Sequence, residues 1–265
     1  MIPTPHSDLA VGHGTHPGET GKNNEDRYSV SSYYGGEGEQ VTLAVICDGI
    51  GGNQAGEVAS NLAVKKITDF IARSGGSDYT ALLDQAVSHA AGAVVDASKT
   101  RPNLKGMGTT CAVALVAGRR LYTAYIGDSR IYLARRGSIM QTSVDHTFIQ
   151  EAIENGLLTP EEARNHPHRH VVRRHIGADA AVRADFRLRL SEAEAPEQSM
   201  RNQGLLLEEG TQVVLCSDGL SDLVDANAIL RALQRQKPQA AVDDLILLAR
   251  RRGGHDNITV IVLKV

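Results

Sequence analysis

Short apolar runs and long amphipathic segments are grouped along this chain rather than alternating one by one. Apolar residues recur at helical spacing over 55–73 and 79–98 and predict two long helices. Because strands follow strands and helices follow helices, the pattern favours antiparallel sheet covered by helices over a regular β-α-β alternation. Runs rich in Val, Ile, Leu and Tyr predict strands over 41–46, 111–117, 121–126, 130–134, 213–216 and 258–264.

Local signals add detail to this pattern. The stretch "LYTAYIGDSRIYLARRG" (121–137) predicts a β-hairpin with its turn around Asp128-Ser129. The stretch "LTPEEA" predicts a helix start, with Thr159 as the N-cap and Glu162 closing a capping box. A further helix is predicted over "AVDDLILLARR" near the C-terminus.

Composition narrows the class of protein. The chain has 265 residues, a net charge of −3 and no Trp, so neither a nucleic acid nor a membrane is an expected partner. The three cysteines lie within or at the end of apolar runs, which is typical of reduced thiols. We expect a soluble, cytoplasmic monomer with one domain over 1–265 and a long surface loop over "SEAEAPEQSMRNQG" (191–204).

Aspartates recur at the ends of the predicted strands. Asp48 and Asp218 each end an apolar run and precede Gly, and Asp128 lies at the predicted turn. Asp26 and Asp256 each precede an apolar run. Any one of them alone is explained by a turn or a cap. Together they predict carboxylates converging at one end of the sheets, where a cation is needed, and oxygen ligands alone favour Mg or Mn over Zn.

Six motifs carry a resemblance to a known family: "NNED", "DGIGGNQAGEVAS", "GTTCAVAL", "IGDSRIYLARRG", "LCSDGLSD" and "GGHDNITVIV". In this order and at these intervals, the chain resembles the metal-dependent protein serine/threonine phosphatases of type 2C from about Thr15 to its end. The resemblance implies an α+β fold, a four-layer α-β-β-α sandwich of two antiparallel sheets flanked by helices. It also implies a flap over about 145–185, beside a metal site at one end of the sandwich.

The resemblance implies the ligands of that site. Asp48 matches the carboxylate that bridges two divalent cations, Mn or Mg, and Gly49 matches the residue whose carbonyl joins it. Asp218 and Asp256 match the remaining ligands of this main centre. Through metal-bound water, these three aspartates are the expected catalytic residues.

Further acids match surrounding positions. Glu25 and Asp26 match residues that hold metal-bound waters. Asp128 and Asp222 match residues that, with Asp218, form a weaker third cation site. Gly108-Thr109-Thr110 is expected in a strand behind the site, as support only.

The resemblance also implies the reaction. Water activated by the cations would hydrolyse phosphoserine and phosphothreonine in phosphorylated proteins, opposing a cognate Ser/Thr kinase. The cysteines fit this reaction, because none has the Arg spacing of a thiolate phosphatase loop, and Cys47 beside Asp48 is expected to pack in the core.

Two departures leave alternatives open. Where the family usually has an Arg that holds the substrate phosphate, this chain has Gly21 followed by Lys22, which is either a point charge on the phosphate or a solvated surface residue. Where animal members have a His after Asp-Gly, this chain has Ile50. The missing Arg is the one argument for an alternative function, a pseudophosphatase that binds phosphoproteins without turnover.

The stretch "RNHPHRHVVRRH" (164–175) contains four His and four Arg. It either contacts phosphorylated substrates or binds a transition metal, or it is a solvated part of the flap, and the last interpretation is favoured.

Overall fold

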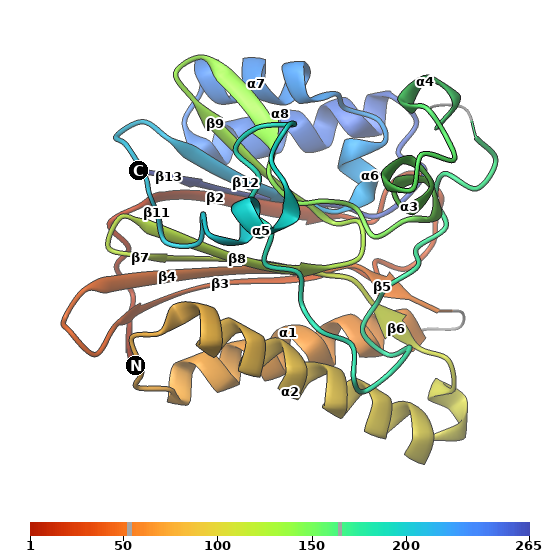
Figure 1. Cartoon of the computed structure of the whole chain (residues 1–265), viewed down its shortest axis with the longest axis horizontal. Helices are drawn as coiled ribbons and strands as arrows, with labels where there is room; N and C mark the ends of the chain where they lie inside the picture. Colours follow the sequence, from red (N-terminus) through yellow and green to blue (C-terminus); the bar gives the residue numbers. More distant parts are fainter. Residues whose placement is uncertain (52–54, 164–165) are drawn as a thin grey trace.

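Two antiparallel sheets lie face to face in the middle of the molecule, and helices cover both outer surfaces (Figure 1). The computed structural model describes residues 1–51, 55–163 and 166–265. Within these residues, the predicted layers of helix, sheet, sheet and helix are confirmed, and the fold is α+β.

The first sheet has six strands in the described residues. In spatial order they are β1 (Ile2–Thr4), β3 (Arg27–Tyr34), β4 (Gln40–Cys47), β7 (Cys111–Ala117), β8 (Arg120–Ile126) and β11 (Leu205–Leu206).

The second sheet has five strands in the same part of the chain. They are β10 (Ser138–Gln141), β9 (Arg130–Arg135), β12 (Gln212–Cys216), β13 (Ile258–Lys264) and β2 (Ala10–His16). A separate ladder joins β5 (Gly49–Ile50) to β6 (Gly108–Thr109) beyond the end of β4.

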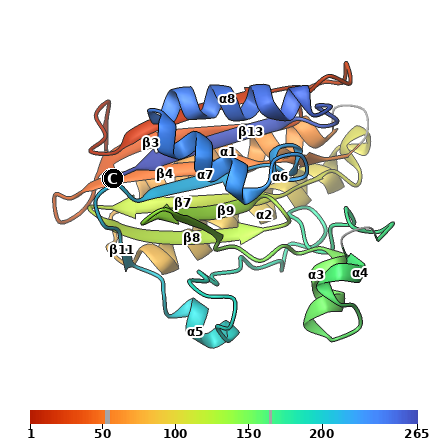
Figure 2. The same cartoon turned by 90° about the horizontal axis from the view of Figure 1, so that it is seen from above.

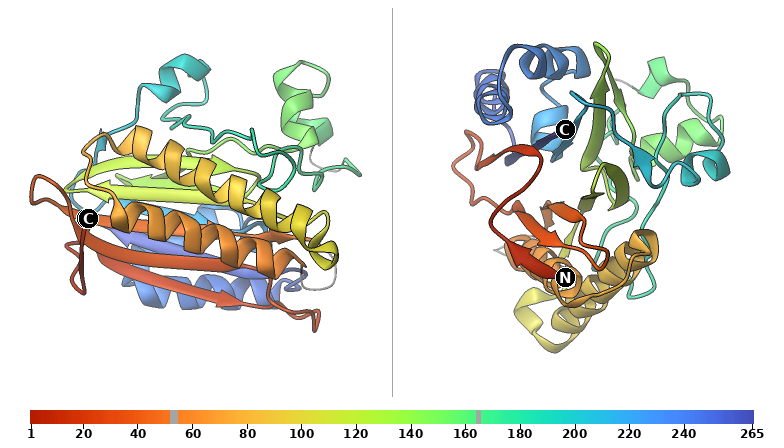
Figure 3. Two further views of the ribbon diagram at one scale, coloured as in Figure 1. Left: turned by 90° about the horizontal axis from the view of Figure 1, so that it is seen from below. Right: turned by 90° about the vertical axis from the view of Figure 1, so that its left-hand side faces the viewer.

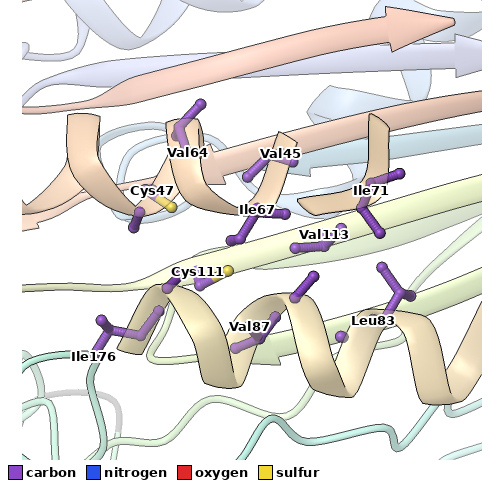
Figure 4. Packing of buried hydrophobic residues seen from close by; sticks show 14 of the residues in the cluster. Val45, Cys47, Val64, Ile67, Ile71, Leu83, Val87, Cys111, Val113 and Ile176 are labelled. Atoms are coloured by element: carbon purple, nitrogen blue, oxygen red, sulfur yellow. The ribbon is translucent and has the colours of Figure 1, made fainter. Parts of the chain in front are cut away.

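Helices α1 (Ala55–Arg73) and α2 (Tyr79–Thr100) run side by side over the first sheet (Figure 3). Asp78 caps α2, because its side chain accepts a hydrogen bond from the Ala81 N–H at 3.0 Å. The apolar stripes of both helices pack on the sheet. Figure 4 shows Val64 and Ile67 of α1 and Val87 of α2 beside strand residues that include Cys47 and Cys111.

Strand β4 is buried on both faces. Leu43, Val45 and Cys47 face α1 and α2, whereas Ala44 and Ile46 face the second sheet. Double burial explains why this strand is a continuous apolar run without polar alternation.

The outer face of the second sheet is covered by α7 (Ala226–Arg235) and α8 (Pro238–Arg251), as Figure 2 shows from above. The predicted C-terminal helix is therefore confirmed. None of the helices in the described ranges combines the length and apolar character needed to cross a bilayer.

The predicted hairpin over 121–137 is wrong. Strand β8 pairs with β7 and β11, whereas β9 pairs with β10 and β12, so the chain crosses from one sheet to the other at 127–129. Both strands are apolar on two faces, and their sequence therefore does not indicate which neighbour they pair with. The hairpin lies one strand further on, where β9 and β10 are joined by Arg136-Gly137, both with positive φ as a type I′ turn requires.

The segment between β10 and β11 runs along one side of the sandwich (Figure 2) and contains α3 (Phe148–Glu154), α4 (Pro160–Ala163) and α5 (Pro196–Met200). The capping box before α4 is confirmed, since the Thr159 N–H donates to Glu162 Oε2 at 2.8 Å and the Glu162 N–H to Thr159 Oγ1 at 3.3 Å. The predicted loop over 191–204 is only partly correct: it contains α5, and Ser199 is buried.

Candidate metal centre

A cavity of about 1650 Å³ opens at one end of the sandwich, where strands of both sheets terminate. Asp48 follows β4 of the first sheet, whereas Asp218 follows β12 and Asp256 precedes β13 of the second. The structure brings these three residues together on the cavity wall. The other predicted acids that line it are Glu25, Asp128 and Asp222.

The main chain of Asp48 is fixed from behind by the Gly108-Thr109-Thr110 segment. The Asp48 carbonyl accepts hydrogen bonds from the Thr109 hydroxyl at 2.7 Å and from the Thr110 N–H at 2.8 Å. The Asp48 N–H donates to Thr110 Oγ1 at 3.0 Å. The expected supporting role of this segment agrees with these contacts, and Thr110 in addition lines the cavity.

Gly49 is packed backbone to backbone against the first turn of α1. A Cβ atom at Gly49 would lie 2.4 Å from the carbonyl carbon and oxygen of Gly56. A larger residue would therefore separate α1 from the cavity wall. The glycines after Asp48 let the chain turn from the strand end into the helix; residues 52–54 of that motif lie outside the described residues.

Asp26 lies behind the wall and is almost completely buried, with 1% of its surface exposed. Its Oδ2 accepts hydrogen bonds from the Ser217 hydroxyl at 2.7 Å and the Thr259 hydroxyl at 2.6 Å. Burial raises the pKa of Asp26 to about 6, although these hydrogen bonds oppose the shift. Its Oδ1 is buried without a hydrogen-bond partner among the described residues.

The acids on the wall raise one another's pKa. Burial, followed by the charges of Asp26 and Asp218, raises the pKa of Asp48 well above its usual range. Burial and the neighbouring charges of Asp128 and Asp256 do the same to the pKa of Asp218. For Asp128, burial is again the main cause and the pKa rises to about 7. Such crowding is costly unless a cation neutralises it.

The donor set fits hard divalent cations. Asp218 Oδ1, like Asp26 Oδ1, is buried without a hydrogen-bond partner in the described part of the chain. No three His, Cys, Asp or Glu side chains among the described residues enclose a metal by themselves. Mg²⁺ commonly uses one or two carboxylates and keeps several waters, so a wall of separated carboxylates suits it better than a closed Zn site.

The comparisons with known proteins agree with this geometry. Residues 13–247 match the family model described as Protein phosphatase 2C. The chain belongs to this family.

Its relatives are serine/threonine phosphatases. The chain is 39% identical over 243 residues to the serine/threonine protein phosphatase PstP of Mycobacterium tuberculosis, covering 92% of this chain and 42% of that protein, so it spans less than half of this relative's length. The crystal structure of the Mycobacterium tuberculosis phosphatase PstP/Ppp superposes with a TM-score of 0.82 at 35% identity, covering 97% of this chain and 98% of that one.

A second structure, the PstP catalytic domain in complex with two manganese ions, has a TM-score of 0.78 at 34% identity and covers 97% of each chain. The two manganese ions of that structure support metal dependence in the protein phosphatase 2C family.

Asn257 holds the segment before β3 against this centre. Its side-chain oxygen accepts from the Glu25 N–H at 2.7 Å, and its amide nitrogen donates to the carbonyls of Pro17 at 3.1 Å and Asn23 at 3.2 Å. Its own N–H donates to Asp256 Oδ1 at 2.8 Å. Asn257 was not among the predicted site residues, although its position directly after Asp256 in "GGHDN" was a signal.

Where this phosphatase 2C chain departs from the expected pattern, Lys22 and Ile50 line the cavity, and Lys22 is exposed. Gly21 is not among the described residues that line it. Gly21 has a φ of 72°, with open space where a side chain would begin. An Arg at this position would adopt a left-handed conformation that only Gly adopts easily.

The His/Arg-rich stretch contributes to the wall as well. Arg169, His170 and His175 line the cavity, and His170 Nδ1 lies 3.0 Å from Asp222 Oδ2. Arg169 and His170 are exposed on this wall and His175 is half-buried, so the interpretation of the stretch as a solvated part of the flap stays a prediction. Residues 164–165 lie outside the described residues. His255, which was not among the predicted site residues either, lines the cavity next to Asp256.

The cysteines lie in the core, as expected. Cys47, Cys111 and Cys216 are free and buried. Burial raises the pKa of Cys47 well above its usual range, and the nearby Cys111 adds to the shift. A thiol in this state is a poor nucleophile.

Proposed function

We propose that this chain hydrolyses phosphoserine and phosphothreonine monoesters in proteins and that it requires Mn²⁺ or Mg²⁺. One observation carries the proposal: carboxylates from both sheets meet on one cavity wall, the pKa values of Asp48 and Asp218 are raised there, and Asp218 Oδ1 has no hydrogen-bond partner among the described residues. The two manganese ions in the related PstP structure give further support.

Asp48, Asp218 and Asp256, with the Gly49 carbonyl, are the residues proposed to hold two cations. Glu25 and Asp26 would hold waters around them, and Asp128 and Asp222, with Asp218, would form a third, weaker site. When bound, the cations supply Lewis-acid chemistry that lowers the pKa of water and neutralises phosphate charge.

Other residues of the cavity wall would bind the substrate phosphate and determine how the leaving oxygen is protonated. Lys22, which lines the cavity, would offer a single charge to the substrate phosphate, without the two parallel hydrogen bonds that an Arg provides. With Ile50 in place of a His, the leaving oxygen would take its proton from solvent or from an imidazole on the wall, of which His255 is one.

We further propose that residues 1–265 form one catalytic domain that acts as a monomer in the cytoplasm and opposes a Ser/Thr kinase. Three buried, free cysteines suit a reducing compartment. Neither a nucleic acid nor a membrane is a proposed partner. The alternative, a pseudophosphatase, is not favoured, because every predicted carboxylate ligand is present and the relatives are named phosphatases.

Turnover of a phosphothreonine peptide tests the proposal. The purified protein should release phosphate with added Mn²⁺ or Mg²⁺ and stop when a chelator is added. Peptide binding measured in the same samples separates the two functions: binding without metal-dependent release would support the pseudophosphatase. Release that persists after exhaustive chelation would reject the metal assignment.

A further inference from the structure

His146 lies outside the cavity wall, yet it is hydrogen-bonded through both ring nitrogens and both backbone groups. Only 4% of its side chain is exposed. It follows Asp145 at the start of the flap (residues 145–185), and the proposed reaction gives it no role. These four hydrogen bonds, one for each ring nitrogen and each backbone group, reach three separate segments of the chain.

The first segment is the crossing between the sheets. The Gly127 N–H donates to His146 Nδ1 at 3.0 Å, and the His146 N–H donates to the Gly127 carbonyl at 2.9 Å. Both backbone groups of the residue before Asp128 are therefore held by one side chain and its own backbone. On its other side Gly127 abuts Thr110, since a Cβ atom there would lie 2.7 Å from Thr110 Cβ.

The second segment is a fixed anchor on the first sheet. Because Nδ1 accepts a hydrogen bond, the neutral ring carries its hydrogen on Nε2, which lies 3.1 Å from Asp185 Oδ2 and donates to it. Asp185 exchanges backbone hydrogen bonds with Tyr125 of β8 at 2.8 and 3.1 Å. Burial raises the pKa of Asp185, but hydrogen bonds from His146 and Arg187 outweigh it and hold the pKa well below the usual range. Arg174 Nη1 also lies 3.1 Å from Nε2, but in this tautomer Nε2 carries the hydrogen and cannot accept from the guanidinium.

The third segment is the end of the flap that returns to the cavity. The Arg173 N–H donates to the His146 carbonyl at 2.7 Å, and the Phe148 N–H donates to the Val171 carbonyl at 2.9 Å. These bonds tie the stretch after Arg169 and His170, which line the cavity, to the same residue that holds Gly127.

We propose that His146 is a positioning residue that couples the returning end of the flap to the Gly127-Asp128 turn, so that the flap and the Asp128 corner of the cavity become ordered together. The proposal rests on the proposed function in one respect, because it takes Asp128 as a ligand of the weaker cation site. It assigns His146 no contact with substrate.

Two substitutions separate the two ends of the coupling. In His146→Asn the amide oxygen can take the place of Nδ1 and accept from Gly127, but the side chain is too short to reach Asp185. In His146→Gln the amide nitrogen can take the place of Nε2, but nothing accepts from Gly127. His168→Gln is the matched control, because its ring makes aromatic contacts with Phe148 and His166 on the same flap.

Hydrogen exchange of the metal-free protein gives a readout that does not depend on turnover. In His146→Gln, exchange over 127–129 should become about tenfold faster, since a buried donor loses its partner. Calorimetry of this variant should show about tenfold weaker Mn²⁺ binding at the weaker site, with two tight sites retained. In His146→Asn, 127–129 should stay protected while 171–176 exchanges faster. Equal changes in both variants and in His168→Gln, or a uniform rise over the whole chain, would overturn the proposal.

A wild-type experiment covers the case in which a variant does not fold. Saturating the weaker site with Mn²⁺ should slow exchange over 127–129 and over 145–148 and 171–176 together. Slowing confined to 127–129 would also reject the coupling. Phosphatase assays on the same wild-type sample test the proposed function separately. An active enzyme without coupled exchange would reject only the role of His146. Coupled exchange in an inactive protein would reject only the proposed activity.

Discussion

Asp48 and Thr110 exchange hydrogen bonds in both directions: the Asp48 N–H donates to Thr110 Oγ1 at 3.0 Å, and the Thr110 N–H donates to the Asp48 carbonyl at 2.8 Å. The same hydroxyl lies 2.7 Å from the Ser129 hydroxyl, so it joins the end of β4 to the crossing between the sheets. The Asp48 N–H therefore depends on the Thr110 side chain, whereas the Asp48 carbonyl is also held by the Thr109 hydroxyl.

Thr110→Val should lower the free energy of unfolding by ~1–3 kcal/mol, because the methyl group that replaces the hydroxyl leaves the Asp48 N–H without an acceptor. Turnover should fall with it. Thr110→Ser keeps the oxygen and should retain most of both properties. Urea unfolding and Mn²⁺-dependent turnover of the two variants provide the comparison, and identical behaviour would show that the hydroxyl is unimportant.

Asp48→Asn and Asp256→Asn should each lower kcat at least ~100-fold while the fold survives, because the loss of a cation removes several kcal/mol of transition-state stabilisation. Steady-state kinetics on one phosphopeptide and calorimetric Mn²⁺ titration measure both effects. Cys47→Ala is the control: it removes a buried thiol next to Asp48 and should keep most of the activity. A larger loss of turnover in Cys47→Ala than in Asp48→Asn would assign the chemistry to the thiol.

The metal-free protein should become less stable as the pH rises from about 4 through about 7. Burial raises the pKa of Asp26 to about 6 and that of Asp128 to about 7, above the value of about 3.9 in an unfolded chain. The folded state therefore binds more protons than the unfolded state in this range, and stability decreases with pH.

Urea unfolding in the presence of a chelator, at several pH values, measures this dependence. Asp128→Asn should flatten the curve, since it removes one of the titrating groups. Mn²⁺ added at pH 8 should restore stability in the wild type. A metal-free protein that is equally stable at both ends of the range would contradict the crowding of carboxylates described for the cavity.

Lys22→Ala should raise KM for a phosphopeptide about tenfold with little change in kcat, because the charge on the phosphate is present in the ground state and the transition state alike. Lys22→Arg should keep KM near the wild-type value. Lys237→Ala, an exposed lysine at the start of α8 and away from the cavity wall, is the control. An unchanged KM in Lys22→Ala would identify Lys22 as a solvated surface residue.

Gly21→Arg is a less direct test of contact with the substrate phosphate than Lys22→Ala. The space around Gly21 is open, but its φ of 72° makes any other residue strained by ~1–2 kcal/mol. Lower KM in this variant should therefore come with a lower unfolding temperature.

The sequence predicted the elements with a strong period well. The helix over 55–73 has the bounds of α1, and the doubly buried β4 and β7 follow their apolar runs closely. It failed at 121–137, because strand pairing depends on which sheet edge is available and not on the residues of the two strands. The short edge strands β1 and β11 carry too few apolar positions to give a period.

The candidate site was predictable because its acids sit at strand ends within recognisable motifs. The residues that fix those acids were harder to find. The side chains of Asn257 and Ser217 form hydrogen bonds to segments 40 to 240 positions away in the chain. The His146 ring does so over 19 and 39 positions, and contacts between such distant segments follow no periodic pattern in the sequence. Only the folded arrangement shows that a single His in "SVDHT" contacts both Gly127 and Asp185.

The crossing of the chain at 127–129 has a consequence for how the protein assembles. Asp48 lies at the end of one sheet, Asp218 and Asp256 lie at the end of the other, and neither half of the chain contains the complete set of proposed ligands. Cation affinity should therefore arise late in folding, after the two sheets have docked. In a stopped-flow refolding experiment, Mn²⁺ uptake would then report the final step of assembly, whereas far-UV signals would report the earlier formation of each layer.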